Sequence, residues 1–405
     1  MSNPRHHHRR RHDRQAHAAA EKAGRTPVLD HVDVVSDAPE MVDTAEALTD
    51  LLAHLKDRGS FAYDTEFIGE TSYRPKVCLI QVATESRLAL IDPLADLDLA
   101  DFWSLLADPA IEKLVHAGEQ DLEHAAVRNG VPCRSVFDTQ VAAGFVELRY
   151  PMSLEDLIAE TTDAELAGKL TFSQWDRRPL SDAQVRYAAD DVRYLPLVAD
   201  ELADRLEEAN MTAWCDQECD LRSVAADPDR RPPRLPKLRR MDVGQRKVLL
   251  AVTRWRETTA AALDQPVRAT ISDGVLKYLS RRKPTHVDHL EEVRDLADSI
   301  IKDHGQALVE AVAEAIEAPD DFAPADPAEG LPDRGEHKEA VETLWKAVRD
   351  RCEERGVSVD LVGAKKHVAR HALAAQVDRT LEDDALLVGW RGELVGDLLR
   401  HPPTP

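Results

Sequence analysis

The sequence lacks any long hydrophobic run, and this absence argues against an integral membrane protein. A helix that crosses a bilayer needs about 18 or more consecutive apolar residues, and no segment of the 405 residues approaches that length. The N-terminus is polar and rich in histidine and arginine, so it offers no hydrophobic signal core. We therefore expect a soluble, cytoplasmic protein with no membrane partner.

Cysteine is also scarce. The five cysteines are scattered along the chain as Cys78, Cys133, Cys215, Cys219 and Cys352, and no CxxC pair occurs. This spacing excludes a disulfide framework, so we expect reduced thiols. Cys215 and Cys219 stand four residues apart on a predicted helix, but no neighbouring cysteine or histidine completes a zinc site. We interpret this pair as chemically inert.

The chain has no excess of positive charge. Its 52 Lys+Arg against 75 Asp+Glu give a formal net charge of -23, which excludes a basic nucleic-acid coat protein. Positive charge is instead concentrated locally, with a net charge of +5 over residues 1–25 and of +9 over residues 230–256. The second stretch is either a nucleic-acid contact or a solvated linker that begins a helix.

Proline-rich polar breaks divide the chain into three folded units. The predicted divisions are a disordered basic arm at 1–27, an α/β unit at 28–222, a basic Pro-rich linker at 223–237, a helical unit at 238–317, a second linker at 318–333 and a second helical unit at 334–405. The arm lacks the composition of a core, and weak tethering of RNA is its alternative role.

The first unit alternates strand and helix patterns. Strands are predicted at 61–67, 77–83, 88–92 and 112–118, and helices at 43–55 (with Asp43 or Thr44 as N-cap), from about 119, at 139–147, at 153–160 and at 181–208. Adjacent hairpin-like strands followed by helices favour a mixed sheet in an α/β fold. The later units show only the 3.6-residue period of helical bundles.

Two acids stand out in the strand FAYDTEF. Asp64 and Glu66 are two residues apart, and a strand places such residues on one face. Two unpaired carboxylates in a partly buried site would raise each other's pKa, and a divalent cation between them would relieve this cost. For a DxE pair alone, a surface-facing strand edge is the favoured interpretation, because DxE is a weak motif.

Three further residues extend this pattern. Asp121 falls in the first turn of a helix that follows a buried strand, where it could also serve only as a partner of the helix dipole. Tyr187 and Asp191 are four residues apart and share one helix face. Asp190 lies about 100° round that helix from Asp191, so both cannot point the same way. We select Asp191 because it pairs with Tyr187, although an ordinary surface contact would look the same.

In this order, the acids and the tyrosine resemble the DEDDy class of 3′–5′ exonucleases. The surrounding sequence segments are similar to motifs of the ribonuclease D family: DTEF, LIQVA, KLVHAGEQDL, VFDTQVAAGF, SLEDL, SQWDRRPL and YAADDVRYL. The resemblance covers residues 28–222 and implies an α/β ribonuclease H-like exonuclease domain. Residues 238–317 resemble an HRDC domain, and residues 334–405 resemble a second, more divergent HRDC-like bundle.

The resemblance also implies roles for these residues. Asp64, Glu66, Asp121 and Asp191 would hold two divalent cations, Mg²⁺ or Mn²⁺, whose preferred ligands are carboxylate oxygens. Asp64 would bridge both ions. Tyr187 would orient the attacking water rather than remove its proton, because a phenol with a pKa near 10 is a poor base at neutral pH.

Other candidates carry weaker expectations. Substrate contacts are predicted at Phe67, Gln81, Trp175, Arg178, Arg239 and Arg240. Gln81 is otherwise a core residue or a hydrogen-bonding neighbour of the site, and packing is the alternative role of the Trp175 loop. Asp138 is interpreted as a helix N-cap, and His116 as a structural residue rather than a ligand.

The family resemblance implies a 3′–5′ exoribonuclease that releases nucleoside 5′-monophosphates and trims tRNA precursors and other structured RNAs. Two alternatives stay open: a DNA exonuclease, because contacts to the 2′-hydroxyl are invisible in sequence, and an inactive RNA-binding scaffold. The presence of all four acids and the tyrosine argues against the scaffold. A monomer is expected.

Overall fold

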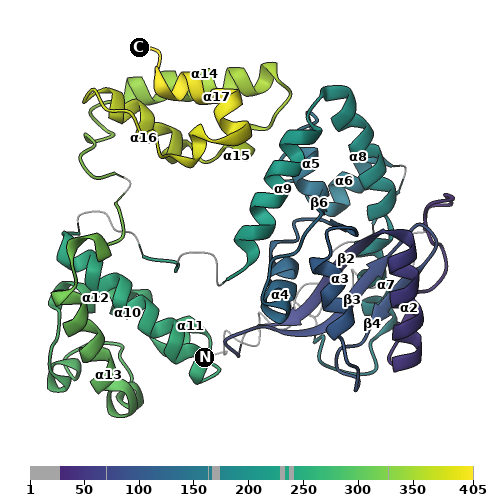
Figure 1. Cartoon of the computed structure of the whole chain (residues 1–405), viewed down its shortest axis with the longest axis horizontal. Coiled ribbons are helices and arrows are strands. Elements are labelled where there is room, and N and C mark those ends of the chain that lie inside the picture. The colour runs from purple at the N-terminus through teal and green to yellow at the C-terminus, as the bar shows by residue number, and fades with distance from the viewer. Residues whose placement is uncertain are drawn as a thin grey trace, which may run out of the picture. The chain divides into compact units, whose positions relative to one another are not determined.

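The computed structural model describes residues 28–69, 71–162, 164–166, 174–228, 233–236, 241–326 and 328–404 (Figure 1). The basic arm predicted at 1–27 lies outside the described residues, as do Arg239 and Arg240. The chain forms two compact units. The described residues of the first unit lie within 28–68, 77–230 and 332–404, and those of the second lie within 69–76 and 231–331.

The first unit is built on a six-stranded sheet with the order β1-β4-β3-β2-β5-β6. Its strands are β1 (Glu40–Val42), β2 (Ser60–Ile68), β3 (Lys76–Ala83), β4 (Leu88–Ile91), β5 (Glu112–Val115) and β6 (Val136–Asp138). β3 and β4 are antiparallel, whereas β1–β4, β2–β5 and β5–β6 are parallel. The mixed sheet predicted from the sequence is confirmed, although the prediction missed the short strands β1 and β6.

Helices cover both faces of this sheet (Figure 1). On one face, α2 (Ala45–Arg58), α3 (Ala100–Ala107) and α4 (Glu119–Asn129) pack with Phe61 and Tyr63 of β2. On the other face, Ala62 packs with α7 (Asp182–Arg193) and α8 (Leu195–Ala209). The side chains of successive residues of β2 therefore point to opposite faces of the sheet, as in any β-strand.

Helix ends follow local sequence signals. Of the two candidate caps for α2, Thr44 is the N-cap, and its side chain accepts a hydrogen bond from the amide of Ala47 at 3.3 Å. α7 begins with a capping box formed by Ser181 and Gln184. The single helix predicted at 181–208 is wrong, because the chain breaks at Tyr194 before Pro196 in the first turn of α8. Proline suits a helix start because it has no amide hydrogen to donate.

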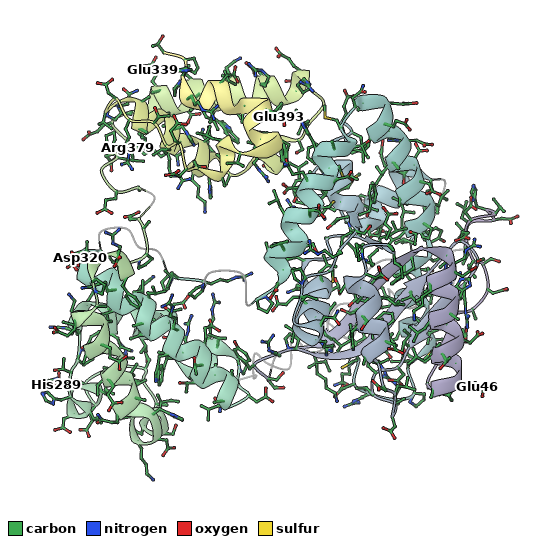
Figure 2. The ribbon with its side chains drawn as sticks, viewed as in Figure 1. Glu46, His289, Asp320, Glu339, Arg379 and Glu393 are labelled. Atoms are coloured by element: carbon green, nitrogen blue, oxygen red, sulfur yellow. The ribbon has the colours of Figure 1, made fainter. Side chains whose placement is uncertain are left out.

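Three more helices complete the part of this unit that contains the sheet: α5 (Thr139–Ala143), α6 (Leu154–Thr161) and α9 (Thr212–Ala226). The C-terminal part consists of α14 (Lys338–Glu354), α15 (Val359–Val362), α16 (Lys365–Ala375) and α17 (Gly389–Arg400). α17 contacts α9 at Trp390 and Arg391. A second contact joins Trp214 Nε1 to Glu393, labelled in Figure 2, at 2.9 Å.

The contact between α9 and α17 is centred on a buried carboxylate. Glu218 is only 2% exposed. It accepts a hydrogen bond from Trp390 Nε1 at 3.0 Å and forms ion pairs with Arg391 at 2.7 Å and Arg222 at 2.8 Å. Burial alone would raise the pKa of Glu218, but hydrogen bonds and charges from Arg391, Trp390 and Arg222 keep it below its usual range. The interface therefore contains a fully partnered ionic core.

The second unit is all-helical, as predicted. It comprises α10 (Val243–Ala262), α11 (Val267–Thr270), α12 (Asp273–Arg282) and α13 (Asp298–Glu317). Their leucines and valines form one core, including Val248, Val252, Leu276, Leu279 and Leu308. Within the described part of the chain, no helix is long and apolar enough to cross a membrane. All five cysteines are buried and free.

We predict that Arg391→Leu lowers the free energy of unfolding by about 2–4 kcal/mol, because it leaves a buried carboxylate with one cation fewer. Chemical denaturation measures the change. The matched control is Arg351→Leu, whose ion pair with Asp397 is more exposed than that of Arg391 with Glu218 and should contribute less than about 1 kcal/mol. Equal effects of the two substitutions would contradict the interpretation.

Candidate active site

The site begins with two acids on one face of β2. Asp64 and Glu66 alternate with Tyr63 and Thr65, and Tyr63 packs with α2, α3 and α4. Asp64 and Glu66 therefore project from the face that α7 covers. Both side chains are partly buried at the end of the strand.

α7 contributes the second pair. Tyr187 and Asp191 lie on one face of this helix, and the Tyr187 hydroxyl donates a hydrogen bond to the Asp191 carboxylate. Asp190 faces elsewhere: it is 4% exposed and paired with Arg186 at 2.6 Å and Arg193 at 3.0 Å. The structure thus separates the two adjacent acids, with Asp191 beside the other carboxylates and Asp190 in an ion-pair network.

α4 supplies the last acid. β5 ends at Val115, the chain turns, and Asp121 lies buried in the first turn of the helix. Its Oδ1 accepts hydrogen bonds from the backbone amide of Thr65 at 3.1 Å and from the Thr65 hydroxyl at 2.5 Å. The Tyr63 hydroxyl donates to the Asp121 carbonyl at 3.2 Å. Asp121 is therefore attached to β2 between the two acids of that strand.

The four carboxylates act on one another electrostatically. Burial, followed by the charges of Asp64 and Asp121, raises the pKa of Glu66 to about 9. Burial and the charges of Asp121 and Asp191 hold the pKa of Asp64 well above its usual range. The pKa of Asp191 shifts in the same direction through burial, Glu66 and Asp190, and burial raises the pKa of Asp121 to about 6.

The tyrosine shares this environment. Burial, followed by the charges of Asp191, Glu66 and Asp64, raises the pKa of Tyr187 above its ordinary value. The phenol therefore keeps its proton at neutral pH. It can donate a hydrogen bond, but it cannot act as a general base.

The chemistry of this donor set fits hard divalent cations. All four candidate ligands are carboxylates, which Mg²⁺ and Mn²⁺ prefer, and the charges that raise their pKa values are those of other acids. Among the described residues, no three such side chains already stand at the spacing of a metal-binding group. Mutual repulsion would oppose such convergence until a cation offsets it.

Comparisons with known proteins agree with this geometry. The family model described as "3'-5' exonuclease" matches residues 39–207, and the model described as "HRDC domain" matches residues 245–312. The ribonuclease D of Gluconacetobacter diazotrophicus is 32% identical over 364 residues, which cover 89% of this chain and 91% of that protein. This chain belongs to the ribonuclease D family. It is accordingly a 3′–5′ exoribonuclease with an HRDC domain.

Further relatives support the assignment to the ribonuclease D family. The ribonuclease D of Granulibacter bethesdensis is 32% identical over 369 residues, covering 89% of this chain and 91% of that one. The crystal structure of Escherichia coli RNase D, described as "an exoribonuclease involved in structured RNA processing", matches with a TM-score of 0.74 at 26% identity. That match covers 90% of this chain and 98% of the other, so the likeness extends beyond the nuclease domain.

Asp138 supports the start of α4. The predicted N-cap is confirmed, since its Oδ1 accepts from the Gln140 amide at 2.9 Å. The same carboxylate also accepts from the amides of Ala117 at 3.0 Å and Gly118 at 3.3 Å. Ala117 has a φ of 54°, which non-glycine residues seldom adopt. Sequence patterns gave no sign of this second role, because residues 117 and 138 are distant along the chain.

His116 is structural, as expected. Its Nδ1 lies 2.9 Å from the hydroxyl of Thr139, and its Nε2 lies 3.0 Å from the carbonyl oxygen of Met152. These contacts occupy both ring nitrogens and help to fix the turn before α4. No ligand role is needed to explain this histidine.

The predicted substrate contacts divide into two groups. Phe67 is partly exposed at the end of β2, with its ring edge-on to His124 at a centroid distance of 4.6 Å. Trp175 is buried and packs in the core beside Tyr187. Arg178 binds both oxygens of Asp92, at 2.5 and 2.6 Å. The packing alternative fits the last two residues better than contact with RNA.

Gln81 is also unsuited to touch a substrate, because it lies wholly inside the domain on β3. A single sequence does not distinguish a buried glutamine from an exposed one at the same position. The alternative interpretation, an internal hydrogen-bonding role, therefore takes precedence over substrate contact.

Three cations of the basic stretch 230–256 are paired with acids and are not available to a nucleic acid. Arg246 pairs with Glu329 at 2.9 Å, Lys247 with Asp320 at 3.4 Å and Arg256 with Asp273 at 2.8 Å, and all three cations are buried. A count of charges along the chain does not show these pairs, because folding brings the acids near. Arg239 and Arg240 lie outside the described residues.

We predict that the stability of the chelator-treated protein falls as pH rises from about 5 to 9. Folded Glu66 keeps its proton up to about pH 9, whereas in the unfolded chain it loses the proton near its ordinary pKa of 4.5, so deprotonation favours unfolding across this window. Melting temperatures across the window test this. Glu66→Gln should flatten the curve, and an unchanged slope in that variant would refute the cause.

We also predict that Asp138→Ser loses more activity than stability. Serine can still cap α5, but it cannot accept hydrogen bonds from the amides of Ala117 and Gly118 as well, so the start of α4 and with it Asp121 should shift. Turnover should fall about tenfold or more. Turnover and melting temperature are measured in parallel on the Asp138→Ser enzyme and the wild type. Full activity in the variant would mean that Asp138 serves only as the N-cap of α5.

Proposed function

We propose that this exoribonuclease trims the 3′ ends of structured RNAs, tRNA precursors among them, and releases nucleoside 5′-monophosphates. The observation that supports the catalytic site is the placement of Asp64, Glu66, Asp121 and Asp191 on β2, α4 and α7, near enough that burial and the charges of other acids in this group raise the pKa values of Asp64, Glu66 and Asp191. The Escherichia coli relative is described as involved in structured RNA processing, and this supports the choice of RNA class.

We propose that the four carboxylates hold two divalent cations, Mg²⁺ or Mn²⁺. When bound, such cations lower the pKa of water and offset the charge that develops at the scissile phosphate. Asp64 would be the ligand common to both cations, Glu66 and Asp191 would hold the cation on the side of the attacking water, and Asp121 would hold the cation on the side of the departing 3′ oxygen. Thr65 fixes Asp121 through two hydrogen bonds.

Tyr187 orients the attacking water by a hydrogen bond from its phenol. Its raised pKa supports this role, since the hydroxyl stays protonated while the metal ligands carry negative charge. Its present partner is Asp191, so the hydroxyl already points toward the carboxylates. Phe67, at the end of β2, is the predicted substrate contact that is best placed to meet the terminal nucleotide.

The parts beyond the nuclease domain bind RNA in this proposal. In the HRDC domain, Arg281 and Arg282 are exposed in the last turn of α12, and they offer phosphate contacts in place of the buried cations of α10. Residues 334–405 form a second HRDC-like bundle, consistent with helices α14 to α17. The domain boundaries, the monomeric state and the cytoplasmic location stay predictions.

An assay with 5′-labelled, 3′-extended RNA and matching DNA, in Mg²⁺, Mn²⁺ or chelator, tests the function. Wild type should shorten RNA from its 3′ end only with metal, and DNA more slowly. Asp64→Asn should lose at least about 10³-fold in rate, and Tyr187→Phe about 10²-fold.

The matched pair for this assay is Asp191→Asn and Asp190→Asn. The first should abolish turnover while leaving the fold intact, whereas the second should lower stability through Arg186 and Arg193 and retain turnover below its melting temperature. Retention of RNA without shortening under any metal would favour the inactive scaffold. Faster digestion of DNA would favour the DNA exonuclease.

A further inference from the structure

Gln81 is a buried side chain whose hydrogen-bonding groups are unused. It is 0% exposed, and neither Nε2 nor Oε1 has a hydrogen-bond partner among the described residues. Native proteins rarely leave both ends of a buried amide unsatisfied, because desolvation is then uncompensated. Such a side chain indicates a partner that forms in another state of the protein.

The strand pattern shows which layer holds this amide. Ile80 and Val82 on either side of Gln81 pack with α2 and α3, so Gln81 faces the opposite layer. Leu79 and Ala83, two residues away in each direction, pack in the clusters that include Ala188 and Ala189 of α7. Gln81 therefore lies beneath α7, in the layer into which Asp64 and Glu66 project.

The neighbouring strand brings Asp64 close. β2 and β3 are adjacent in the sheet, and the connection at 69–75 is too short for a parallel crossover, so they run antiparallel. Ala62 and Ala83 belong to the same core cluster. Asp64 lies two residues after Ala62, and Gln81 lies two residues before Ala83, so Asp64 and Gln81 occupy the same face of neighbouring strands, where side chains interact across and diagonally between strands.

We propose that Gln81 is a positioning residue whose amide donates a hydrogen bond to the Asp64 carboxylate and orients it toward the cations. This inference rests on the proposed function. Substitution of a residue that hydrogen-bonds a metal ligand, without itself touching the metal, commonly lowers metal affinity by about 10- to 100-fold. Asp121 has Thr65 for this purpose and Asp191 has Tyr187, and Gln81 is the equivalent for Asp64.

The test is Gln81→Met in the full-length protein, with Mn²⁺ affinity measured by calorimetry and melting temperature measured in chelator. We expect Mn²⁺ to bind about tenfold more weakly. The melting temperature without metal should stay the same or rise, because an unsatisfied amide is replaced by an apolar chain of similar length. Unchanged affinity would overturn the proposal, and so would a lower melting temperature in chelator, which would mean that Gln81 has a structural partner.

The matched control is Gln140→Met. The Gln140 amide donates to the Met152 carbonyl at 2.8 Å, so this variant should melt at a lower temperature and bind Mn²⁺ as wild type does. Asp64→Asn distinguishes a failure of the proposed function from a failure of the role proposed for Gln81. If wild type itself binds no Mn²⁺, the proposed function fails. If wild type binds Mn²⁺ and Asp64→Asn does not, while Gln81→Met binds normally, only the role of Gln81 fails.

Discussion

Repulsion among four carboxylates is the constraint around which the nuclease domain is organised. Asp64, Glu66, Asp121 and Asp191 come from three elements; burial raises the pKa of each, and the charge of each raises the pKa of others in the group as well. A protein could relieve this repulsion with arginines, but cations from the chain would then occupy the place that a divalent ion needs. The fold accepts an unfavourable charge arrangement where the chemistry is to occur.

Hydrogen bonds from neutral side chains hold two of these acids in place. Thr65 binds Asp121, and Tyr187 binds Asp191. Arginines close to the site are engaged with other acids: Arg178 with Asp92, and Arg186 with Asp190. A neutral donor fixes the orientation of a carboxylate without cancelling its charge. The two arginines instead stabilise the surrounding structure, because each pairs with an acid outside the group of four.

Regular local geometry made much of this predictable from sequence. Residues two apart on a strand and four apart on a helix must share a face, so Asp64 could be paired with Glu66, and Tyr187 with Asp191, from their spacing alone. Roles that depend on distant partners could not be predicted. Asp138 binds amides about twenty residues earlier in the chain, and Arg246 pairs with a glutamate in a later segment. Composition gives no indication of either contact.

The buried Glu218 has a consequence for how this chain could evolve. Helical modules at the ends of enzymes are often gained or lost, because a flexible linker lets one be added without changing the rest. Here the C-terminal helices supply Trp390 and Arg391 to a carboxylate of α9. A descendant that lost them would have a solvated glutamate beside an exposed apolar surface around Phe145, which packs on Trp390. Deletion would therefore need compensating substitutions in the nuclease domain, which ties the two modules into one inherited unit.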